Sequence, residues 1–283
     1  GTGVTIGGVF TPAGVGDFVL TYTFTDFNSC VNSDTMIVTV EAPQVADAGT
    51  DFDICVDASI YVLTGFAPSG GTWSGVGVTG NSFNPTSAGV GTHVLTYSFG
   101  SGTCLSTDTI IVTVNPLPIV SVNSATICLG QTATLNASGA DTYSWIPNTN
   151  ISATNGATVT VDPSSTISYT VTGTNTATGC SNTSMSTVTV NPLPVVDAGS
   201  DITLCNQPIS YDLTGYSPSN GVWSGTGVTI GGVFTPAGVG DFELTYTFTN
   251  SNSCVNSDTI IVTVVAPQVA DAGTDFDICV DAS

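Results

Sequence analysis

The sequence contains no lysine and no arginine. Its 283 residues include 21 Asp and Glu side chains and a single histidine, so the formal net charge is −21 at pH 7. Affinity for DNA and RNA comes largely from Lys and Arg that neutralise phosphates, and anionic membrane surfaces attract the same cationic side chains. The composition therefore argues against nucleic acid as a partner and against an anionic membrane surface.

Long apolar runs are also absent. No stretch approaches the roughly 20 residues that span a bilayer, and the start of the sequence has no positively charged region of a signal peptide. We therefore expect no direct membrane contact from this chain, and an exported protein would carry its signal outside this sequence. Disorder is disfavoured, because 41% of the residues are hydrophobic and 8% are aromatic.

Chemistry for catalysis is scarce. Acid–base and nucleophilic catalysis need a base within reach of a nucleophile, and His93 is the one side chain that normally titrates near neutral pH. It has no counterpart in the neighbouring repeats described below. We expect a plain surface histidine, no enzyme activity and no cofactor apart from the calcium considered below.

An internal repeat organises the chain. Residues 1–59 recur as 225–283 with five differences, an offset of 224 residues. This period contains three copies of a shorter repeat, and each copy ends in an alternating strand and a proline-containing joint such as DTIIVTVNPLP. We name these copies module 1 (44–118), module 2 (119–194) and module 3 (195–267). A partial module, 1–43, precedes them, and 268–283 is the start of the next.

Each module shows the pattern of short strands. Runs of four to eight residues alternate apolar and polar side chains, are rich in Val, Ile, Thr, Tyr and Phe, and are separated by Gly, Asn, Ser and Pro. No segment has a helical period. Seven such runs in about 75 residues with a central Trp predict an all-β chain, a tandem string of small seven-stranded immunoglobulin-like sandwiches.

The immunoglobulin pattern also predicts core residues, with strands lettered A to G. A tryptophan marks strand C, and a tyrosine on strand F has the spacing of a tyrosine corner, which closes the turn between strands E and F. The expected core residues are Trp73, Trp145, Trp223, Tyr97, Tyr169 and Tyr246.

Several phrases carry a resemblance to a known group. TYSWIPNTN, STISYTVTGTNTATGCSNTSMSTVTV and FTPAGVGDFELTYTFTNSNSC resemble the immunoglobulin-like and PKD-like repeats of giant Bacteroidota surface adhesins of the gliding-motility (SprB) type, which are exported by type IX secretion. The resemblance covers the whole chain. It implies structural stalk repeats of a long extracellular, cell-surface filament that serves adhesion and gliding motility, with neighbouring repeats of the same chain as partners.

The resemblance also implies a modification. In these bacteria an Asp-Ser/Thr-apolar triplet can be O-glycosylated. Such triplets begin three of the last strands of the repeats, which makes Thr35, Thr109 and Thr259 candidate sites. The alternative is a plain strand start.

Two other functions remain open. A module can bind surface polysaccharide through exposed aromatic side chains, for which the candidates are Tyr61, Phe66, Tyr143, Tyr211 and Tyr216. The same repeats can also serve as spacers of a secreted enzyme, and this sequence does not separate that reading from the stalk.

Acidic residues gather after the joints. Asp47 and Asp51 follow one joint, and Asp197 and Asp201 follow another. Calcium prefers several carboxylate and carbonyl oxygens on a turn, so these four residues are candidate calcium ligands that would stiffen a string of modules. The spacing is not that of an EF-hand loop. The alternative is solvated carboxylates that keep filaments apart by repulsion.

The eight cysteines predict disulfides and an oxidising, extracellular compartment, because no pair has the CxxC spacing of a zinc site. Pairing within a module would join Cys128 to Cys180. Cys128, however, lies at the turn between strands A and B, and Cys180 lies in the F–G turn at the opposite end. At strand rise these ends are on the order of 30 Å apart, whereas bridged Cα atoms lie about 4.4 to 6.8 Å apart.

In a head-to-tail string the two cysteine-bearing turns of successive modules face each other. We therefore predict Cys55–Cys180 and Cys128–Cys254, which link successive modules, with pairing inside modules as the alternative. The remaining four cysteines, Cys30, Cys104, Cys205 and Cys279, would pair with repeats outside this sequence or be left without partners.

Overall fold

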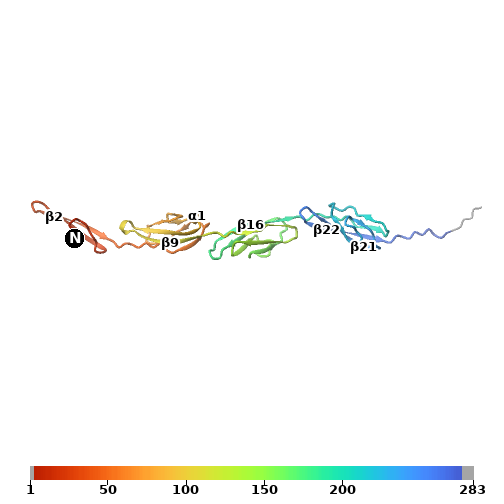
Figure 1. Ribbon diagram of the computed structural model, residues 1–283, viewed down its shortest axis with the longest axis horizontal. Helices are drawn as coiled ribbons and strands as arrows, with labels where there is room; N and C mark the ends of the chain where they lie inside the picture. The colour runs from red at the N-terminus through yellow and green to blue at the C-terminus, as the bar shows by residue number, and fades with distance from the viewer. Residues whose placement is uncertain (1–2, 276–283) are drawn as a thin grey trace, which may run out of the picture. The chain divides into compact units, whose positions relative to one another are not determined.

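The computed structural model describes residues 3–275 of the chain, and nearly all of its regular structure is β-strand (Figure 1). The chain divides into two compact units, Gly1–Pro118 with Thr174–Asn182, and Ile119–Gly173 with Thr183–Ser283. Three separate clusters of buried apolar side chains lie within modules 1, 2 and 3, one in each. The predicted class, an all-β chain of immunoglobulin-like sandwiches, is confirmed.

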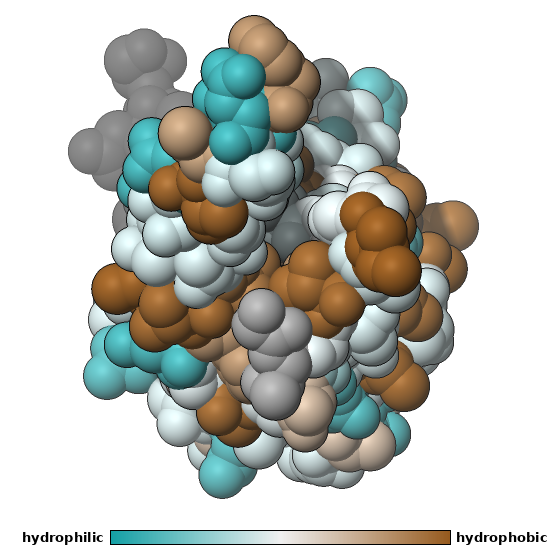
Figure 2. Space-filling model, turned by 90° about the vertical axis from the view of Figure 1, so that its left-hand side faces the viewer, coloured by the Kyte–Doolittle hydropathy of each residue, from teal (hydrophilic) through white to brown (hydrophobic). Residues whose placement is uncertain are grey.

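The first compact unit begins with a hairpin. Strands β1 (Gly16–Thr25) and β2 (Val31–Val40) pair antiparallel, with Tyr22 opposite Asp34. Large apolar side chains of this hairpin are exposed, among them Tyr22 and Met36. Figure 2 shows hydrophobic side chains at the surface of the end of the chain that contains the hairpin.

Module 1 follows with seven strands in two sheets. The four-stranded sheet has the order β3 (Phe52–Cys55), β9 (Ser106–Asn115), β8 (Gly91–Phe99) and β5 (Thr72–Ser74). The three-stranded sheet has the order β4 (Tyr61–Val62), β7 (Ser82–Phe83) and β6 (Val78–Thr79). Strand β3 is parallel to β9, and the other pairs are antiparallel.

Module 2 has the seven strands expected from its sequence. One sheet contains β10 (Ser121–Val122), β12 (Ala133–Ser138) and β14 (Thr158–Val161). The other contains β11 (Ala125–Cys128), β16 (Ser181–Asn191), β15 (Ile167–Thr174) and β13 (Thr142–Ile146). In β12 every second side chain is buried, because successive residues of a strand point to opposite faces.

Module 3 departs from the expected seven strands. It has a four-stranded sheet and a two-stranded sheet, six strands in all among the described residues. The larger sheet has the order β17 (Ile202–Cys205), β22 (Val255–Val265), β21 (Gly240–Thr249) and β19 (Val222–Ser224), and the smaller pairs β18 (Tyr211–Asp212) with β20 (Val233–Phe234). A single bridge between Val228 and Phe234 stands where module 1 has the β6–β7 pair.

The expectation of no helix is wrong in module 1. Residues Pro85–Ala88 form one turn of helix, α1, and Gly102–Cys104 form a 3-10 turn. Asn84 caps α1, because its side-chain oxygen accepts a hydrogen bond from the Ser87 N–H at 3.2 Å. Proline occupies the first turn, where a backbone N–H would have no partner within the helix. A single turn is too short for its period to show in the sequence.

All six expected core residues are buried. The expected role of the tyrosines in the E–F turn is wrong, however. The Tyr97 hydroxyl donates to the Pro68 carbonyl and accepts from the Gly71 N–H, and both residues lie before strand β5. Tyr246 does the same with Pro218 and Gly221. Tyr97 and Tyr246 therefore fasten strand F to the loop that precedes strand C, whereas the Tyr169 hydroxyl donates to the Thr149 and Asn150 carbonyls, which follow strand C.

Candidate functional site: cysteine clasps between modules

The cysteines Cys55, Cys128 and Cys205 occupy one structural position. Each is the last residue of a short strand, β3, β11 or β17, that runs parallel to the last strand of its module. Cys55 lies opposite Asn115, and Cys128 lies opposite Asn191, next to the proline-containing joint that leads into the following module. The strand register thus places each of these cysteines beside the exit of the chain from its module.

Cys30, Cys104, Cys180 and Cys254 lie in or next to the turn between the last two strands of their repeats. In module 3 the side-chain oxygen of Asn250 accepts hydrogen bonds from the backbone N–H of Asn252 and Cys254, at 2.9 and 3.0 Å. In module 2 the Cys180 N–H donates to the Thr178 hydroxyl at 3.3 Å. Cys180 and Cys254 are buried, so their sulfur atoms lie away from solvent.

Two disulfides join these positions across modules. Cys55 is bonded to Cys180 and Cys128 to Cys254, with Cα–Cα distances of 5.7 and 5.5 Å, inside the normal range. These are the two pairs expected from the positions of the turns. Cys30, Cys104 and Cys205 are free and exposed, and Cys279 lies outside the described residues.

Asparagine side chains contact the joints beside the disulfides. The Nδ2 group of Asn182 donates to the Pro118 carbonyl at 3.1 Å, and that of Asn256 donates to the Pro194 carbonyl at 2.9 Å. A proline lacks an N–H but keeps its carbonyl, which needs a donor. These contacts were not predicted, although the sequence has an Asn two residues after both Cys180 and Cys254.

The disulfides overlap along the chain and share the segment between Cys128 and Cys180. From Cys55 to Cys254 the backbone has 199 steps (254 − 55). Through Cys55–Cys180 alone the covalent path has 74 backbone steps (254 − 180), and through Cys128–Cys254 alone it has 73 (128 − 55). Through both bonds it has only 52 (180 − 128). Either bond alone therefore gives a short covalent route between the same two points.

The acidic residues after the joints act as backbone acceptors. The Oδ1 atoms of Asp51 and Asp201 accept from the N–H of Ile111 and Ile261, and those of Asp47 and Asp197 accept from Gly49 and Gly199, all at 2.8 or 2.9 Å. Within residues 3–275 no three His, Cys, Asp or Glu side chains come close enough together to hold a metal. Calcium binding stays a prediction, and calorimetric titration with calcium tests it.

The aromatic candidates separate into core and surface. Phe66 packs edge-on against Trp73 at 5.8 Å between ring centroids, and Tyr216 packs in the same way against Trp223 at 5.7 Å, so neither is a surface platform. The Tyr143 hydroxyl donates back to the Ala140 carbonyl. Tyr211 is half-buried. Tyr61 is exposed and stacks at 4.5 Å on Phe52, at the side of a hollow of about 270 Å³.

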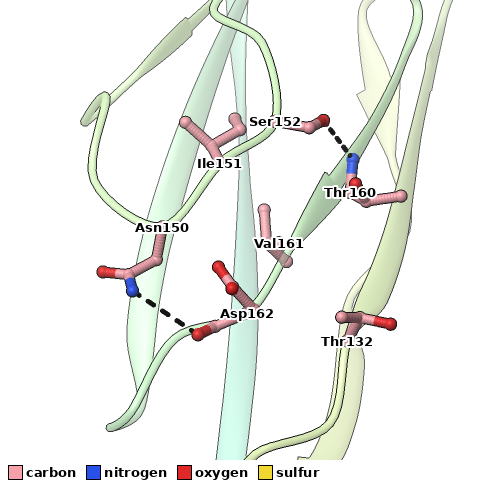
Figure 3. Close-up of a pocket in the computed structure, with 7 residues that line it drawn as sticks. All are labelled: Thr132, Asn150, Ile151, Ser152, Thr160, Val161 and Asp162. Carbon is pink, nitrogen blue, oxygen red and sulfur yellow. Dashed lines mark hydrogen bonds between the residues drawn. The ribbon is translucent and has the colours of Figure 1, made fainter.

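A second hollow, of about 300 Å³, lies in module 2 (Figure 3). Ser152 and Asn150 line it and are held by hydrogen bonds to the Thr160 N–H and the Asp162 carbonyl. Asp162 is the one carboxylate among its lining residues, which include no histidine and no cysteine. His93 lies elsewhere, in module 1, where its Nε2 is 2.8 Å from the Gly89 carbonyl. The described residues therefore contain no nucleophile–base pair built around this histidine.

The candidate glycosylation residues Thr35, Thr109 and Thr259 are all exposed on strands β2, β9 and β22. Their modification stays a prediction, for which intact mass is the direct test. Among residues 3–275, no helix has the length and hydropathy needed to cross a membrane.

Comparison with known proteins gives similarity of fold. No protein-family model matches the chain, and no curated protein matches it either. Among solved structures, the eight N-terminal immunoglobulin domains of Down syndrome cell adhesion molecule match 88% of this chain at 11% identity and a TM-score of 0.37, and the chain spans 43% of that structure's length.

Two further structures illustrate the range. The titin I-band fragment I67–I69 is matched over its full length and over 81% of this chain, at 12% identity and a TM-score of 0.36. A calcium-stabilised adhesin of an Antarctic bacterium that binds ice is matched over 82% of its length and 89% of this chain, at 14% identity and a TM-score of 0.39.

Proposed function

We propose that this chain is a load-bearing segment of a long extracellular adhesin filament. The observation that carries the proposal is the pair of overlapping disulfides between modules. A polypeptide under tension extends along its shortest covalent route. Between Cys55 and Cys254 that route crosses both bonds and follows the 52 backbone steps between Cys128 and Cys180 (180 − 128), so most of modules 1 and 3 is shielded from load.

The overlap also provides redundancy. If one disulfide is reduced, the other still gives a route of 73 or 74 backbone steps, far shorter than the 199 steps of the unbridged backbone. A stalk that is pulled repeatedly benefits from this arrangement, whereas a freely dissolved binding protein gains nothing from it. The disulfides also favour an oxidising compartment and hence an extracellular, cell-surface location.

The cellular setting of the proposal is adhesion coupled to gliding motility, with export by type IX secretion. Support for this finer part comes from the repeat phrases alone. Antibodies against module 2 should label intact cells of the organism that makes the protein. Labelling that appears only after lysis would contradict a surface location.

Deletion of residues 44–267, one full period, separates a stalk from an adhesive module. For a stalk we expect cells to keep their attachment under flow but to be held closer to the surface, by the length of three modules. Loss of attachment with unchanged distance would show that the modules themselves bind the surface. Cells that express the complete protein serve as the matched control.

Binding of neutral polysaccharide is the second candidate, and the hollow beside Tyr61 favours it. Phe52, Tyr61 and the backbone of Gly49 and Thr50 line a space with apolar and polar walls, as sugar rings require. The absence of Lys and Arg disfavours acidic sugars. Titration with neutral oligosaccharides should give heat that Tyr61→Ala removes and Tyr211→Ala, in module 3, leaves unchanged. No heat from the unaltered chain would reject this candidate.

A further inference from the structure

Module 2 has a tyrosine at a position where modules 1 and 3 have glycine. Tyr143 lies two residues before the core tryptophan of its module, and the equivalent residues are Gly71 and Gly221. An added Cβ at Gly71 would lie 2.5 Å from the Tyr97 hydroxyl. At Gly221 it would lie 2.6 Å from the Tyr246 hydroxyl. In modules 1 and 3 the tyrosine of strand F therefore occupies the space beside this position.

In module 2 the tyrosine of strand F points to a different loop. The Tyr169 hydroxyl donates to the carbonyls of Thr149 and Asn150, at 3.0 and 3.2 Å, and both residues follow strand β13. Tyr143 is half-buried at the beginning of that strand. Module 2 thus has room for a second tyrosine ring that its neighbours cannot accommodate.

The Tyr143 ring is held in place from two sides. Its hydroxyl accepts from the Ala140 N–H and donates to the Ala140 carbonyl, both at 2.8 Å. Strand β15 passes close to the ring at Gly173, where an added Cβ would lie 2.7 Å from the Val120 Cγ2 atom and 3.4 Å from the Tyr143 Cε1 atom. A ring that is already fixed loses little conformational entropy when a ligand covers it.

An open hollow of about 500 Å³ lies beside this ring. Its volume falls in the range of about 300 to 1,000 Å³ that is typical of small-molecule sites. All of its lining residues belong to module 2. They are Asp141, Thr142, Tyr143, Asn155, Gly156 and Ala157.

The backbone of the hollow is tied to strand β13. The Gly156 N–H donates to the Tyr143 carbonyl at 3.2 Å, and the Gly156 carbonyl accepts from the Trp145 indole N–H at 2.9 Å. Asn155 forms a β-bridge with Ser144. Both backbone groups of Gly156 are thus paired within the module, so contact with a ligand falls to the side chains of the hollow.

These side chains offer an apolar surface and polar groups next to each other. The Tyr143 ring and the Ala157 methyl group are apolar. Asp141 and Asn155 carry a carboxylate and an amide, and Thr142 carries a hydroxyl. A pyranose ring has the complementary surface, with C–H groups on its face and hydroxyls at its edge. The carboxylate and the absence of Lys and Arg disfavour an acidic sugar.

We infer that this hollow of module 2 binds a neutral sugar unit of a polysaccharide, with the Tyr143 ring against the C–H face of the pyranose and the Asp141 and Asn155 side chains on its hydroxyls. The inference shares its ligand class with the second candidate function. It assigns the binding to module 2, however, in place of the hollow beside Tyr61 in module 1. The proposed stalk needs neither site.

The test titrates the complete chain in a calorimeter with neutral hexasaccharides of glucose, of mannose and of N-acetylglucosamine. We expect at least one of them to bind with a Kd of about 1 mM or tighter. Tyr143→Ala should weaken this binding about tenfold or more, because it removes the aromatic contact. Tyr61→Ala, in module 1, is the matched control and should leave the heat unchanged.

A milder variant separates binding from folding. The Asn155 side chain is exposed, so Asn155→Ala should keep the melting temperature of the chain. It should weaken the binding about threefold or more, because it removes a polar contact to the sugar.

Hydrogen exchange locates the bound sugar in the unaltered chain. At a ligand concentration of ten times Kd, the backbone N–H groups of Trp145 and Gly156 should exchange up to about tenfold more slowly. Peptides that contain Trp73 or Trp223, the equivalent positions of modules 1 and 3, should not change and serve as the internal control.

The outcomes distinguish this site from the functions proposed above. No heat from any of the three hexasaccharides would overturn the inference together with the second candidate function, and the stalk would be unaffected. Heat that Tyr61→Ala removes and Tyr143→Ala leaves unchanged would overturn the inference alone. If Tyr143→Ala lowers the melting temperature, Asn155→Ala and hydrogen exchange decide, and an unchanged value of either would contradict the site.

Discussion

Modules 2 and 3 each bury a tryptophan, but their cores are held by different polar contacts. In module 2 the Trp145 Nε1–H donates to the Gly156 carbonyl at 2.9 Å, whereas the buried Trp223 Nε1–H of module 3 has no partner among the described residues. In module 3 Asp258 holds the segment before the first strand by accepting from the Ala198 N–H, and module 2 uses the buried Ser186 hydroxyl, which donates to the Asn123 carbonyl at 2.7 Å. The cysteine positions, in contrast, are the same in both modules. The polar anchors are exchangeable, and the clasp is the shared feature.

The largest effect should come from the tryptophans. Trp145→Ala and Trp223→Ala should each cost about 3 to 5 kcal/mol of unfolding free energy, which is enough to unfold a small module. The comparison is sharpened by phenylalanine, which removes the N–H but keeps an aromatic ring. Trp223→Phe should cost less than Trp145→Phe, because only Trp145 loses a hydrogen bond and leaves an acceptor unpaired. Equal costs in denaturant titrations would contradict the contrast between the modules.

The clasp should give the next largest effect. Replacement of Cys128 and Cys254 together by Ser should lower the free energy of unfolding by about 2 to 4 kcal/mol, because the disulfide restricts the unfolded chain. Cys205→Ser is the matched control, since Cys205 has the same strand position and no bond. We expect no change in its melting temperature. A control variant that loses as much stability as the double variant would mean that the strand position, and not the bond, is what matters.

The smallest effect concerns the acidic anchor of module 1. Hydrogen bonds from the backbone N–H of Ala48 and then of Thr109 lower the pKa of Asp108 below 3.8. A lowered pKa stabilises the fold above the unfolded value, and this contribution disappears as the pH falls from about 3.8 through the lower folded value. Asp108→Asn should therefore lower the melting temperature at pH 7 and have progressively less effect below pH 3.8.

Ser186→Ala in module 2 provides the pH-independent comparison for this anchor. A hydroxyl does not titrate in this range, so we expect the same loss of melting temperature at pH 7 and at pH 3. If the effect of Asp108→Asn were also constant with pH, its carboxylate would not be the anchor.

The alternation of apolar residues was enough to predict the strands, the buried tryptophans and the fold class. It also placed the cysteines, because strand length and turn position follow from a period of two. The alternation did not predict hydrogen bonds that depend on a single side chain. The tyrosine hydroxyls reach Pro68 and Pro218, about 28 residues upstream, and no local spacing records such a distant acceptor.

The remaining differences have similar causes. Module 3 has six strands where seven were predicted, because Val228 forms a single bridge instead of a short strand. The difference amounts to one backbone pair. The Phe66 and Tyr216 rings could be assigned to the surface from their neighbours in sequence, but the tertiary fold turns them onto Trp73 and Trp223. Side-chain destinations in loops are set by packing that sequence alone does not record.

The central claim is that the clasps shorten the covalent route through the chain, and single-molecule stretching tests it most directly. With the chain held by its ends and fully unfolded, reduction of both disulfides should add 147 backbone steps (199 − 52), or about 490 to 530 Å at 3.3 to 3.6 Å per residue. Cys55→Ser alone should lengthen the oxidised contour by only 21 backbone steps (73 − 52), or about 70 to 75 Å, since the route through Cys128–Cys254 remains. An equal contour with and without reductant, or a long contour in the single variant, would contradict the account.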